Sequence, residues 1–204
     1  MARLVTFGCS HTFGQYLPDI QDNHSVASKL AWPSLLANKL NLELDNQAIP
    51  GISNIGILES IIKYEFTKED YAIVMWTYYD RDRIWDMDGK PHNYQFAHIS
   101  KFSTKSKWLD VHNPIDTRIR SWFYIHHAKT LFESKLDKFL MLLIHHDPEF
   151  IIHKPYFITD IDFPKIYFCD YIKILPKALD ENHGGVNCHR YFALDLFTLI
   201  GNMK

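Results

Sequence analysis

The sequence predicts an α/β fold: a three-layer α/β/α sandwich with a central parallel sheet and an insertion after the third strand. Two observations lead to this class. Apolar, β-rich runs alternate with helical patterns along the 204 residues, and such alternation is typical of parallel sheets with helices on both faces. The run YAIVMWT at residues 71–77 is apolar almost throughout, as expected of a strand covered on both sides.

Composition narrows the class further. The chain is 47% hydrophobic, enough for a substantial core, and its net charge is −2 with acids and bases well mixed. A dedicated nucleic-acid binder usually carries a basic stripe, and none is visible here. We therefore expect a single domain over residues 1–204 and no nucleic-acid partner. The oligomeric state is left open.

Cysteines and histidines give no sign of a disulfide framework or a metal site. Three cysteines at unrelated spacings fit neither pattern, so a reducing compartment is the simpler interpretation. The histidine pairs at 126–127 and 145–146 are adjacent in sequence, and adjacent helical residues do not face one another. No apolar run reaches the length of a membrane span, and the chain starts with a strand pattern, not a leader. We expect a cytoplasmic protein without cofactor, metal or membrane span.

The first half of the chain shows clear element boundaries. Strands are expected where short apolar runs end in turn residues, and helices where apolar residues recur at helical spacing. Pro33 suits the first turn of a helix, and Ser53 is a good N-cap. The expected elements are a strand at Arg3–Gly8, a helix at Trp32–Leu40, a strand at Leu42–Asn46, a helix at Asn54–Phe66 and a strand at Tyr71–Thr77.

The second half is less regular. Residues 78–116 are aromatic and charged without a firm period, which predicts an insertion or lid. Leu136–His146 fits two structures, because its apolar residues recur at helical spacing while FLMLLI also suits a buried strand; the helix is favoured. The remaining expected elements are a helix at Thr117–Ser134, a strand at Tyr156–Ile161, a polar loop at Leu179–His189 and a helix at Tyr191–Ile200.

Small and polar residues follow three predicted strands. Ser10, Gly51 and Thr77–Tyr79 each come just after a strand, so they meet at one sheet edge, where the chemistry of such folds lies. A serine hydroxyl needs a base to become a nucleophile, and that base is best a histidine oriented by a carboxylate. Asp180 and His183 lie three residues apart in a polar loop and can face the same pocket. Each segment alone also fits an ordinary turn; their joint occurrence predicts a Ser-His-Asp triad.

These segments resemble the blocks of the SGNH (GDSL-type) hydrolases. Gly8-Cys9-Ser10 is similar to that family's Gly-Asp-Ser block, NQAIPGISN at 46–54 to its second block, and Asp180-Glu-Asn-His183 to its last. The resemblance implies a flavodoxin-like fold and a serine esterase. It also implies that the backbone N–H groups of Ser10 and Gly51 bind the oxyanion. The form CSHTFG, with WT after the third strand, resembles variants encoded by tailed bacteriophages.

Two positions depart from the family pattern. Cys9 stands where the family has an aspartate before the nucleophile. That aspartate is not the acid of the triad. The third block, normally Gly-x-Asn-Asp, reads TYYD at 77–80, so the asparagine that would donate to the oxyanion is missing. Tyr79 occupies its place and Thr77 is a second candidate, because both carry a hydroxyl donor. Loss of one donor typically costs about 10²–10³ in turnover.

The expected substrate is a short-chain carboxylic ester, because no long apolar trough is recognisable. Aromatic and hydrogen-bonding residues in 78–116 suit a sugar ring and suggest an O-acetyl ester on a glycan. Packing of these aromatics onto the sheet is the slightly favoured explanation. Five residues beside the blocks are candidates for substrate contact: His11, Asn54, Trp76, Arg81 and Trp85.

Two alternatives stay open. The missing asparagine would also suit a weak or inactive member of the fold that binds a glycan, a phage component or another partner protein. A thiol-dependent hydrolase using Cys9, or a metal-dependent one, is a further possibility. Retention of Ser10, Asp180 and His183 in one chain favours the esterase.

Overall fold

The computed structural model describes residues 2–20, 25–79, 81–85, 88, 90–95 and 114–202. For residues 82, 84, 85, 91–95 and 114 it describes the backbone alone. At its centre lies a four-stranded sheet with the order β2-β1-β3-β6, and all its pairings are parallel. The strands are β1 (Arg3–Phe7), β2 (Glu43–Asn46), β3 (Tyr71–Trp76) and β6 (Lys138–Leu143).

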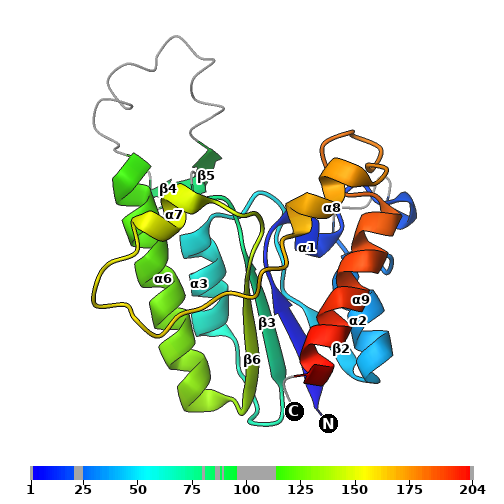
Figure 1. The fold of residues 1–204 in the computed structure, drawn as a ribbon, viewed down its shortest axis with the longest axis horizontal. Helices are drawn as coiled ribbons and strands as arrows, with labels where there is room; N and C mark the ends of the chain where they lie inside the picture. The colour runs from blue at the N-terminus through cyan, green and yellow to red at the C-terminus, as the bar shows by residue number, and fades with distance from the viewer. Residues whose placement is uncertain are drawn as a thin grey trace.

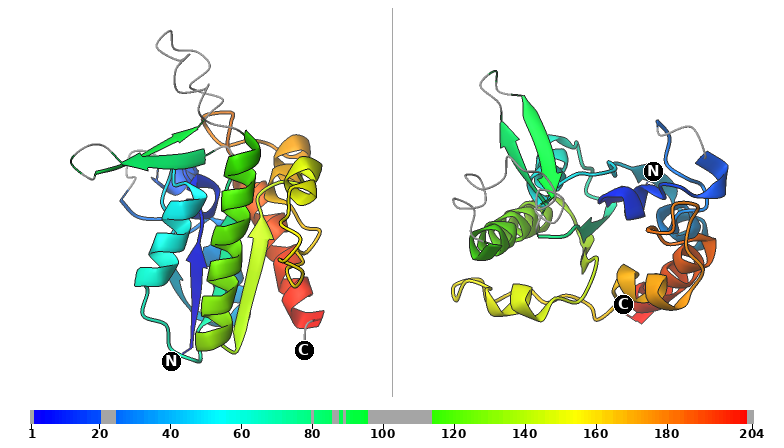
Figure 2. Two further views of the ribbon diagram at one scale, coloured as in Figure 1. Left: turned by 90° about the vertical axis from the view of Figure 1, so that its left-hand side faces the viewer. Right: turned by 90° about the horizontal axis from the view of Figure 1, so that it is seen from above.

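Helices cover both faces of this sheet. On one side α2 (Trp32–Leu40) packs against α9 (Val186–Asn202), and on the other α3 (Asn54–Lys63) packs against α6 (Pro114–Lys135). Figure 1 shows the two pairs on opposite sides of the strands, and the view from above in Figure 2 shows the same separation. The predicted three-layer α/β/α architecture is confirmed.

Short elements gather beyond the carboxyl ends of the strands, at the top of Figure 1. The hairpin formed by β4 and β5 falls within the predicted insertion. The aromatic residues Phe96, Phe102 and Trp108 of that insertion lie outside the described residues. The short elements are α1 (Ser10–Phe13), the 3₁₀ turn η1 (Pro18–Ile20), β4 (Arg81–Trp85), β5 (Pro91–Gln95), α7 (Pro148–Ile152) and α8 (Phe168–Ile174).

Two expected elements are wrong. Leu136–His146 contains the strand β6 and not a helix, because its residues pair one by one with β3, from Tyr71↔Lys138 to Trp76↔Leu143. The helical spacing of its apolar residues arises because they are apolar nearly without interruption, as in any strand buried on both faces. The expected strand at Tyr156–Ile161 is an irregular segment, and Tyr156 is 92% exposed.

Near the C-terminus the helical content is larger than predicted. The final helix starts at Val186 and not at Tyr191, so the polar loop before it is shorter. Two of the added residues, Cys188 and His189, are buried against the rest of the fold. Helix α8 was not predicted, because its seven residues are too few to show a helical period.

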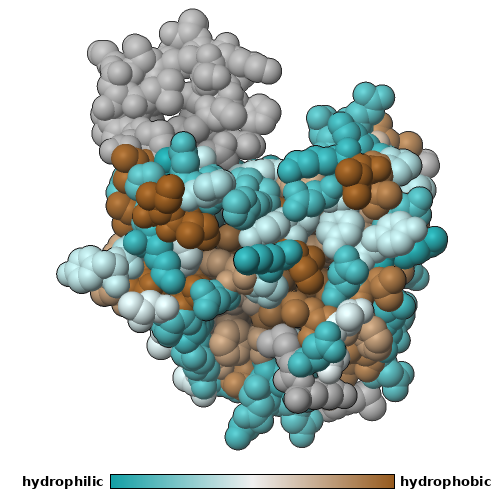
Figure 3. All heavy atoms as spheres, in the orientation of Figure 1, coloured by the Kyte–Doolittle hydropathy of each residue, from teal (hydrophilic) through white to brown (hydrophobic). Residues whose placement is uncertain are grey.

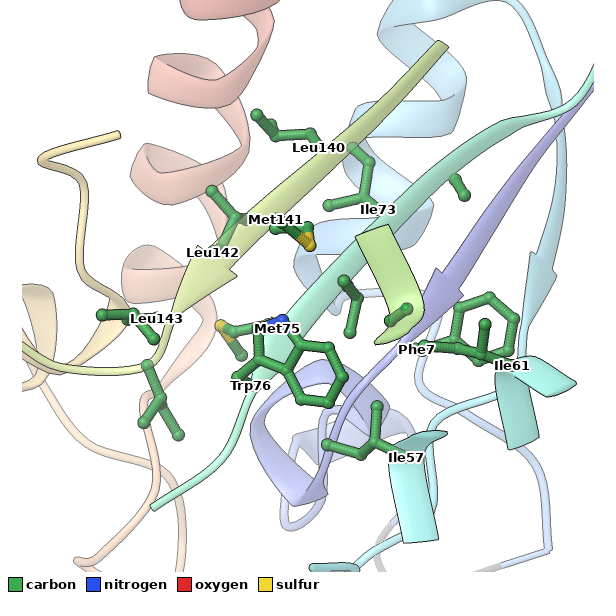
Figure 4. Close-up of a cluster of buried hydrophobic side chains, with 14 of the residues drawn as sticks. Phe7, Ile57, Ile61, Ile73, Met75, Trp76, Leu140, Met141, Leu142 and Leu143 are labelled. Atoms are coloured by element: carbon green, nitrogen blue, oxygen red, sulfur yellow. The ribbon is translucent and has the colours of Figure 1, made fainter. Parts of the chain in front are cut away.

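Large apolar side chains fill the space between the sheet and the helices. Figure 4 shows Phe7 of β1, Trp76 of β3 and Ile57 of α3 in one cluster. All three are at most 1% exposed. Trp76 is the last residue of β3, so the core extends to the edge of the sheet where the polar segments begin.

The surface near α7 carries several apolar side chains. Ile151 and Ile152 of α7 are exposed, and so is Phe157 in the segment that follows. The face drawn in Figure 3 shows hydrophobic atoms gathered at the position of α7. Among the described residues, no helix combines the length and the hydrophobicity that crossing a bilayer requires.

A buried histidine joins α9 to the start of α2. The backbone N–H of Trp32 donates to Nδ1 of His189 over 3.1 Å, and His189 is 1% exposed. Burial, together with a smaller effect of the nearby His183, lowers the pKa of His189 to about 3. His189 is therefore neutral in the folded protein at ordinary pH, which leaves Nδ1 able to accept this hydrogen bond.

We predict that His189 makes the fold sensitive to acid. Between its ordinary pKa of 6.5 and its folded-state value of about 3, the unfolded chain binds a proton at this position and the folded protein does not. Stability therefore falls as the pH falls, by about 1.4 kcal/mol per pH unit for one such group. His189→Gln keeps an acceptor but cannot titrate. Urea unfolding at several pH values between about 6 and 4 should show a shallower slope for this variant.

The matched control is His127→Gln, because His127 is exposed on α6. Its stability should depend on pH as the wild type does. An unchanged slope for His189→Gln would show that His189 is protonated in the folded protein.

Candidate active site

The first strand delivers Ser10 to the sheet edge through a tight turn. Cys9 is the N-cap of α1, and Ser10 is the first residue of that helix. A Cβ at Gly8 would lie 2.2 Å from Oγ1 of Thr12 and 2.8 Å from its Cβ, so the turn leaves room only for glycine. The Ser10 side chain is thus presented at the end of β1 by steric constraint.

The structure brings Ser10, His183 and Asp180 together in one chain of hydrogen bonds. Nε2 of His183 lies 2.8 Å from Oγ of Ser10, and Nδ1 lies 2.6 Å from Oδ2 of Asp180. The backbone N–H of His183 also donates to Oδ1 of Asp180 over 3.1 Å. In this arrangement Nδ1–H donates to the carboxylate, and Nε2 can accept the serine proton.

The Asp180 carboxylate is held in its charged form. Burial acts to raise the pKa of Asp180, but hydrogen bonds from the side chain and backbone of His183 and from the Asn182 backbone outweigh it. The pKa is therefore below its ordinary value. An ionised carboxylate at this position orients the imidazole and can stabilise a positive charge on it.

Two rings lie against the His183 imidazole. His11 is 4.7 Å from it and Tyr16 is 5.2 Å from it, centroid to centroid. Burial lowers the pKa of His11 well below its ordinary value, and electrostatic interactions with His183, His189 and Arg81 act in the same direction. A neutral His11 does not repel a proton on His183.

Tyr16 was missed by sequence reasoning. It lies in a stretch without helical or strand period, and its backbone has φ of 65°, which a non-glycine residue seldom adopts. Strained residues of this kind cluster at functional sites. Nothing in the local sequence indicates either the strain or the contact with His183.

Two backbone N–H groups, at the start of α1 and in the loop after β2, have no hydrogen-bond acceptor among the described residues. Within the described part of the chain, neither Ser10 nor Gly51 donates its backbone N–H to another residue. Gly51 has φ of 75°, and its loop is tied to the start of α1 because Ile49 N–H donates to the Gly8 carbonyl over 3.0 Å. These two N–H groups are available to an anionic oxygen.

The end of β3 is fixed by a buried amide. The backbone N–H of Thr77 donates to Oδ1 of Asn54 over 2.9 Å, and Nδ2 of Asn54 donates to the Thr77 carbonyl over 3.3 Å. Nδ2 also lies 3.2 Å from Oγ of Ser121 on α6. Asn54 therefore locks the position of Thr77 and ties it to α3 and α6.

The two hydroxyl candidates for the missing asparagine differ in their partners. Oη of Tyr79 accepts from Nη2 of Arg118 over 2.9 Å, and its ring stacks on Phe150 with 6.2 Å between centroids. Oγ1 of Thr77 accepts from Nη1 of Arg81 over 3.2 Å. Both hydroxyls are thus oriented by an arginine.

The residues expected to contact substrate fall into three groups. His11 follows Ser10 and packs against His183. Arg81 lies beside Thr77. Asn54 and Trp76 are corrected: Asn54 is 2% exposed with its amide bonded to Thr77, and Trp76 is fully buried in the core. Both therefore support the site from within. The side chain of Trp85 lies outside the described residues.

In the ranges that the structure describes, no group of three or more His, Cys, Asp or Glu side chains is placed to hold a metal ion.

Comparison with protein-family models and with curated proteins gave no match. Solved structures are similar over nearly the whole chain. A member of the lipolytic protein G-D-S-L family from Veillonella parvula is 13% identical, with 97% of this chain and 99% of that chain covered and a TM-score of 0.50. The psychrotrophic esterase EstA from Pseudoalteromonas sp. is 10% identical, with 98% of each chain covered and a TM-score of 0.52.

An acetyl xylan esterase, Est2A from the rumen bacterium Butyrivibrio proteoclasticus, has a TM-score of 0.59 at 11% identity, over 98% of this chain and 63% of that chain. At such identities the likeness establishes the fold. The chain thus has the α/β/α fold of GDSL lipolytic proteins and esterases. The likeness to bacteriophage variants is untested by these comparisons and stays a prediction.

We predict that Asn54→Ala weakens both the fold and the site. The substitution leaves the buried N–H of Thr77 without its acceptor, which should lower the free energy of unfolding by roughly 1–3 kcal/mol. Turnover of an ester substrate should also fall, because Thr77 is no longer fixed. Denaturant unfolding and ester hydrolysis measure the two effects. Asn38→Ala, at an exposed position of α2, is the control and should change neither by much.

Proposed function

We propose that this protein is a serine ester hydrolase that acts through a Ser-His-Asp triad. The observation that carries this proposal is the continuous path from Ser10 Oγ to His183 Nε2 at 2.8 Å and from His183 Nδ1 to Asp180 at 2.6 Å. A serine hydroxyl, an imidazole and a carboxylate in this order and at hydrogen-bond distance are the parts that acyl transfer needs.

In the first half-reaction Ser10 Oγ attacks the ester carbonyl carbon. As the new C–O bond forms, the serine proton passes to His183 Nε2 and the carbonyl π electrons move to the oxygen. The tetrahedral intermediate then collapses, the bond to the leaving alkoxide breaks, and His183 gives the proton to the departing alcohol. Asp180 stays ionised and stabilises the imidazolium between these steps.

In the second half-reaction water repeats the sequence on the acyl-enzyme. His183 Nε2 takes a proton from the attacking water, and the second tetrahedral intermediate expels Ser10 Oγ, which takes that proton back. The products are one carboxylic acid and one alcohol, and the enzyme returns to its starting state.

The oxyanion of both intermediates needs donors at the sheet edge. The backbone N–H groups of Ser10 and Gly51 are the two we assign, since neither is used by the protein itself within the described residues. Donors fixed in advance toward developing charge supply much of the catalysis in such sites.

For the substrate we propose a short-chain ester, with an O-acetyl group on a glycan preferred. Aromatic residues in the insertion suit sugar rings, and one similar structure is an acetyl xylan esterase. We take residues 1–204 to act as one domain in this reaction.

A non-catalytic binding module is the second candidate. It is favoured by one observation: Tyr79, at the place of the missing asparagine, is held by Arg118 and by stacking on Phe150, so its side chain is directed toward α6 and α7. The test of catalysis therefore decides between the two functions.

We predict that wild-type protein hydrolyses p-nitrophenyl acetate and is labelled by a fluorophosphonate at Ser10. Ser10→Ala and His183→Ala should each lower kcat at least 10³-fold, because the nucleophile or its base is lost. Mass spectrometry of the labelled peptide locates the adduct. Ser134→Ala, at an exposed position of α6 where the hydroxyl donates to the Leu131 carbonyl, should keep activity and label. Equal background rates in all proteins and no adduct would favour the binding module.

We also predict release of acetate from an acetylated polysaccharide. Acetate is measured after incubation with wild type and with Ser10→Ala, and only the wild type should release it. Good turnover of simple lipid esters without acetate release from any acetylated polysaccharide would contradict the glycan assignment while leaving the esterase intact.

A further inference from the structure

The side chains of Arg81 and Thr77 meet at the end of β3 in a way that the triad does not explain. We propose that the Thr77 hydroxyl is the side-chain donor to the oxyanion, and that Arg81 is the positioning residue that aims and polarises it. This inference rests on the esterase function proposed above and adds the group that takes over from the missing asparagine.

The parallel sheet brings Thr77 and Ser10 to the same edge. β1 and β3 are parallel neighbours, and Phe7, the last residue of β1, pairs with Val74. Ser10 begins the helix that follows β1, and Thr77 follows the last residue of β3, so both residues lie beyond the carboxyl ends of adjacent strands. Because Asn54 bonds both the N–H and the carbonyl of Thr77, the backbone that carries this hydroxyl is fixed.

The hydrogen bond with Arg81 determines the role of the Thr77 hydroxyl. A guanidinium has donors and no acceptor, so Oγ1 of Thr77 must be the acceptor in the 3.2 Å contact with Arg81 Nη1. The hydroxyl hydrogen therefore points away from Arg81 and is free to be donated. A cationic donor on the oxygen also makes that hydrogen a stronger donor, because hydrogen bonds in a chain polarise one another.

Arg81 is itself held in place next to the triad. Its guanidinium lies over the Tyr78 ring at 5.2 Å, and the hydroxyl of Tyr78 lies 3.2 Å from Sγ of Cys169 on α8. Its charge also acts on His11, which follows Ser10 in the chain and packs against His183. The cation is thus near the reacting groups without needing to touch the substrate.

Tyr79 is the weaker candidate because other side chains hold both its hydroxyl and its ring. Its oxygen accepts from Arg118 on α6, and its ring stacks on Phe150 of α7. These contacts direct the Tyr79 side chain toward α6 and α7. Among the described residues, the hydrogen bond of the Thr77 hydroxyl is the one with Arg81.

The effect should appear in the transition state and not in substrate binding. The ground-state carbonyl oxygen carries little charge, whereas the tetrahedral oxygen carries nearly a full negative charge. A donor polarised by Arg81 therefore stabilises the tetrahedral oxygen more than the ground-state carbonyl oxygen. Loss of this donor should lower kcat with little change in KM.

The test compares p-nitrophenyl acetate kinetics of Thr77→Val, Thr77→Ser, Arg81→Met and the double variant Thr77→Val/Arg81→Met. Thr77→Val should lower kcat about 10²–10³-fold, the range seen for loss of one oxyanion donor. Thr77→Ser should restore most of it, since the hydroxyl is kept. As a single variant, Arg81→Met should lower kcat. In the double variant it should lower kcat hardly further than Thr77→Val does, because both residues act through one hydroxyl.

Control variants separate this mechanism from misfolding. Thr130→Val removes an exposed hydroxyl on α6 and should leave kcat unchanged, and thermal unfolding should be similar for all variants.

Tyr79→Phe should lower kcat less than Thr77→Val does. A wild-type kcat for Thr77→Val, a larger loss for Tyr79→Phe, or multiplied losses in the double variant would each overturn the inference. If wild type and Ser10→Ala do not differ, the esterase function fails and this inference fails with it; if they differ and Thr77→Val is fully active, only this inference fails.

Discussion

Parallel hydrogen bonding between β1 and β3 is the constraint on which the candidate site depends. β1 ends at Phe7, opposite Val74, and β3 ends two residues later at Trp76, so that the segments after both strands leave the sheet at the same edge. A shift of this register by one residue would turn every side chain of one strand to the other face of the sheet. The core then stabilises the register, because both strands are buried on both faces.

Two buried polar side chains fix the segments around the sheet by hydrogen bonds to the backbone. Asn54 sits at the start of α3 and bonds the backbone of Thr77, while His189 sits in α9 and accepts from the start of α2. A buried polar group without a partner is costly, so each of these side chains favours one arrangement of its helix over the alternatives. The candidate site is thus held by groups that lie behind it.

Much of this could be predicted from the sequence. The alternation of strands and helices gives the layers, and two short segments contain Ser10, Asp180 and His183, which the structure brings within hydrogen-bond distance. Predictions from local sequence patterns were wrong where contacts between distant residues determine the secondary structure. FLMLLI suits a helix or a strand, and only pairing with β3 makes it a strand. The positions of Tyr16 against His183 and of Arg81 against Thr77 leave no periodic signal, because irregular segments place them.

The contact between Ser10 and His183 joins residues 173 positions apart in the sequence. Forming this contact closes nearly the whole chain into one loop. The loss of chain entropy is large for so long a loop, so we expect the contact to form late in folding. In a partly folded chain whose segment around residue 183 has not yet packed against the end of β1, Ser10 lacks its hydrogen bond to His183. The pair is therefore assembled by the whole fold, and neither half of the sequence contains it alone.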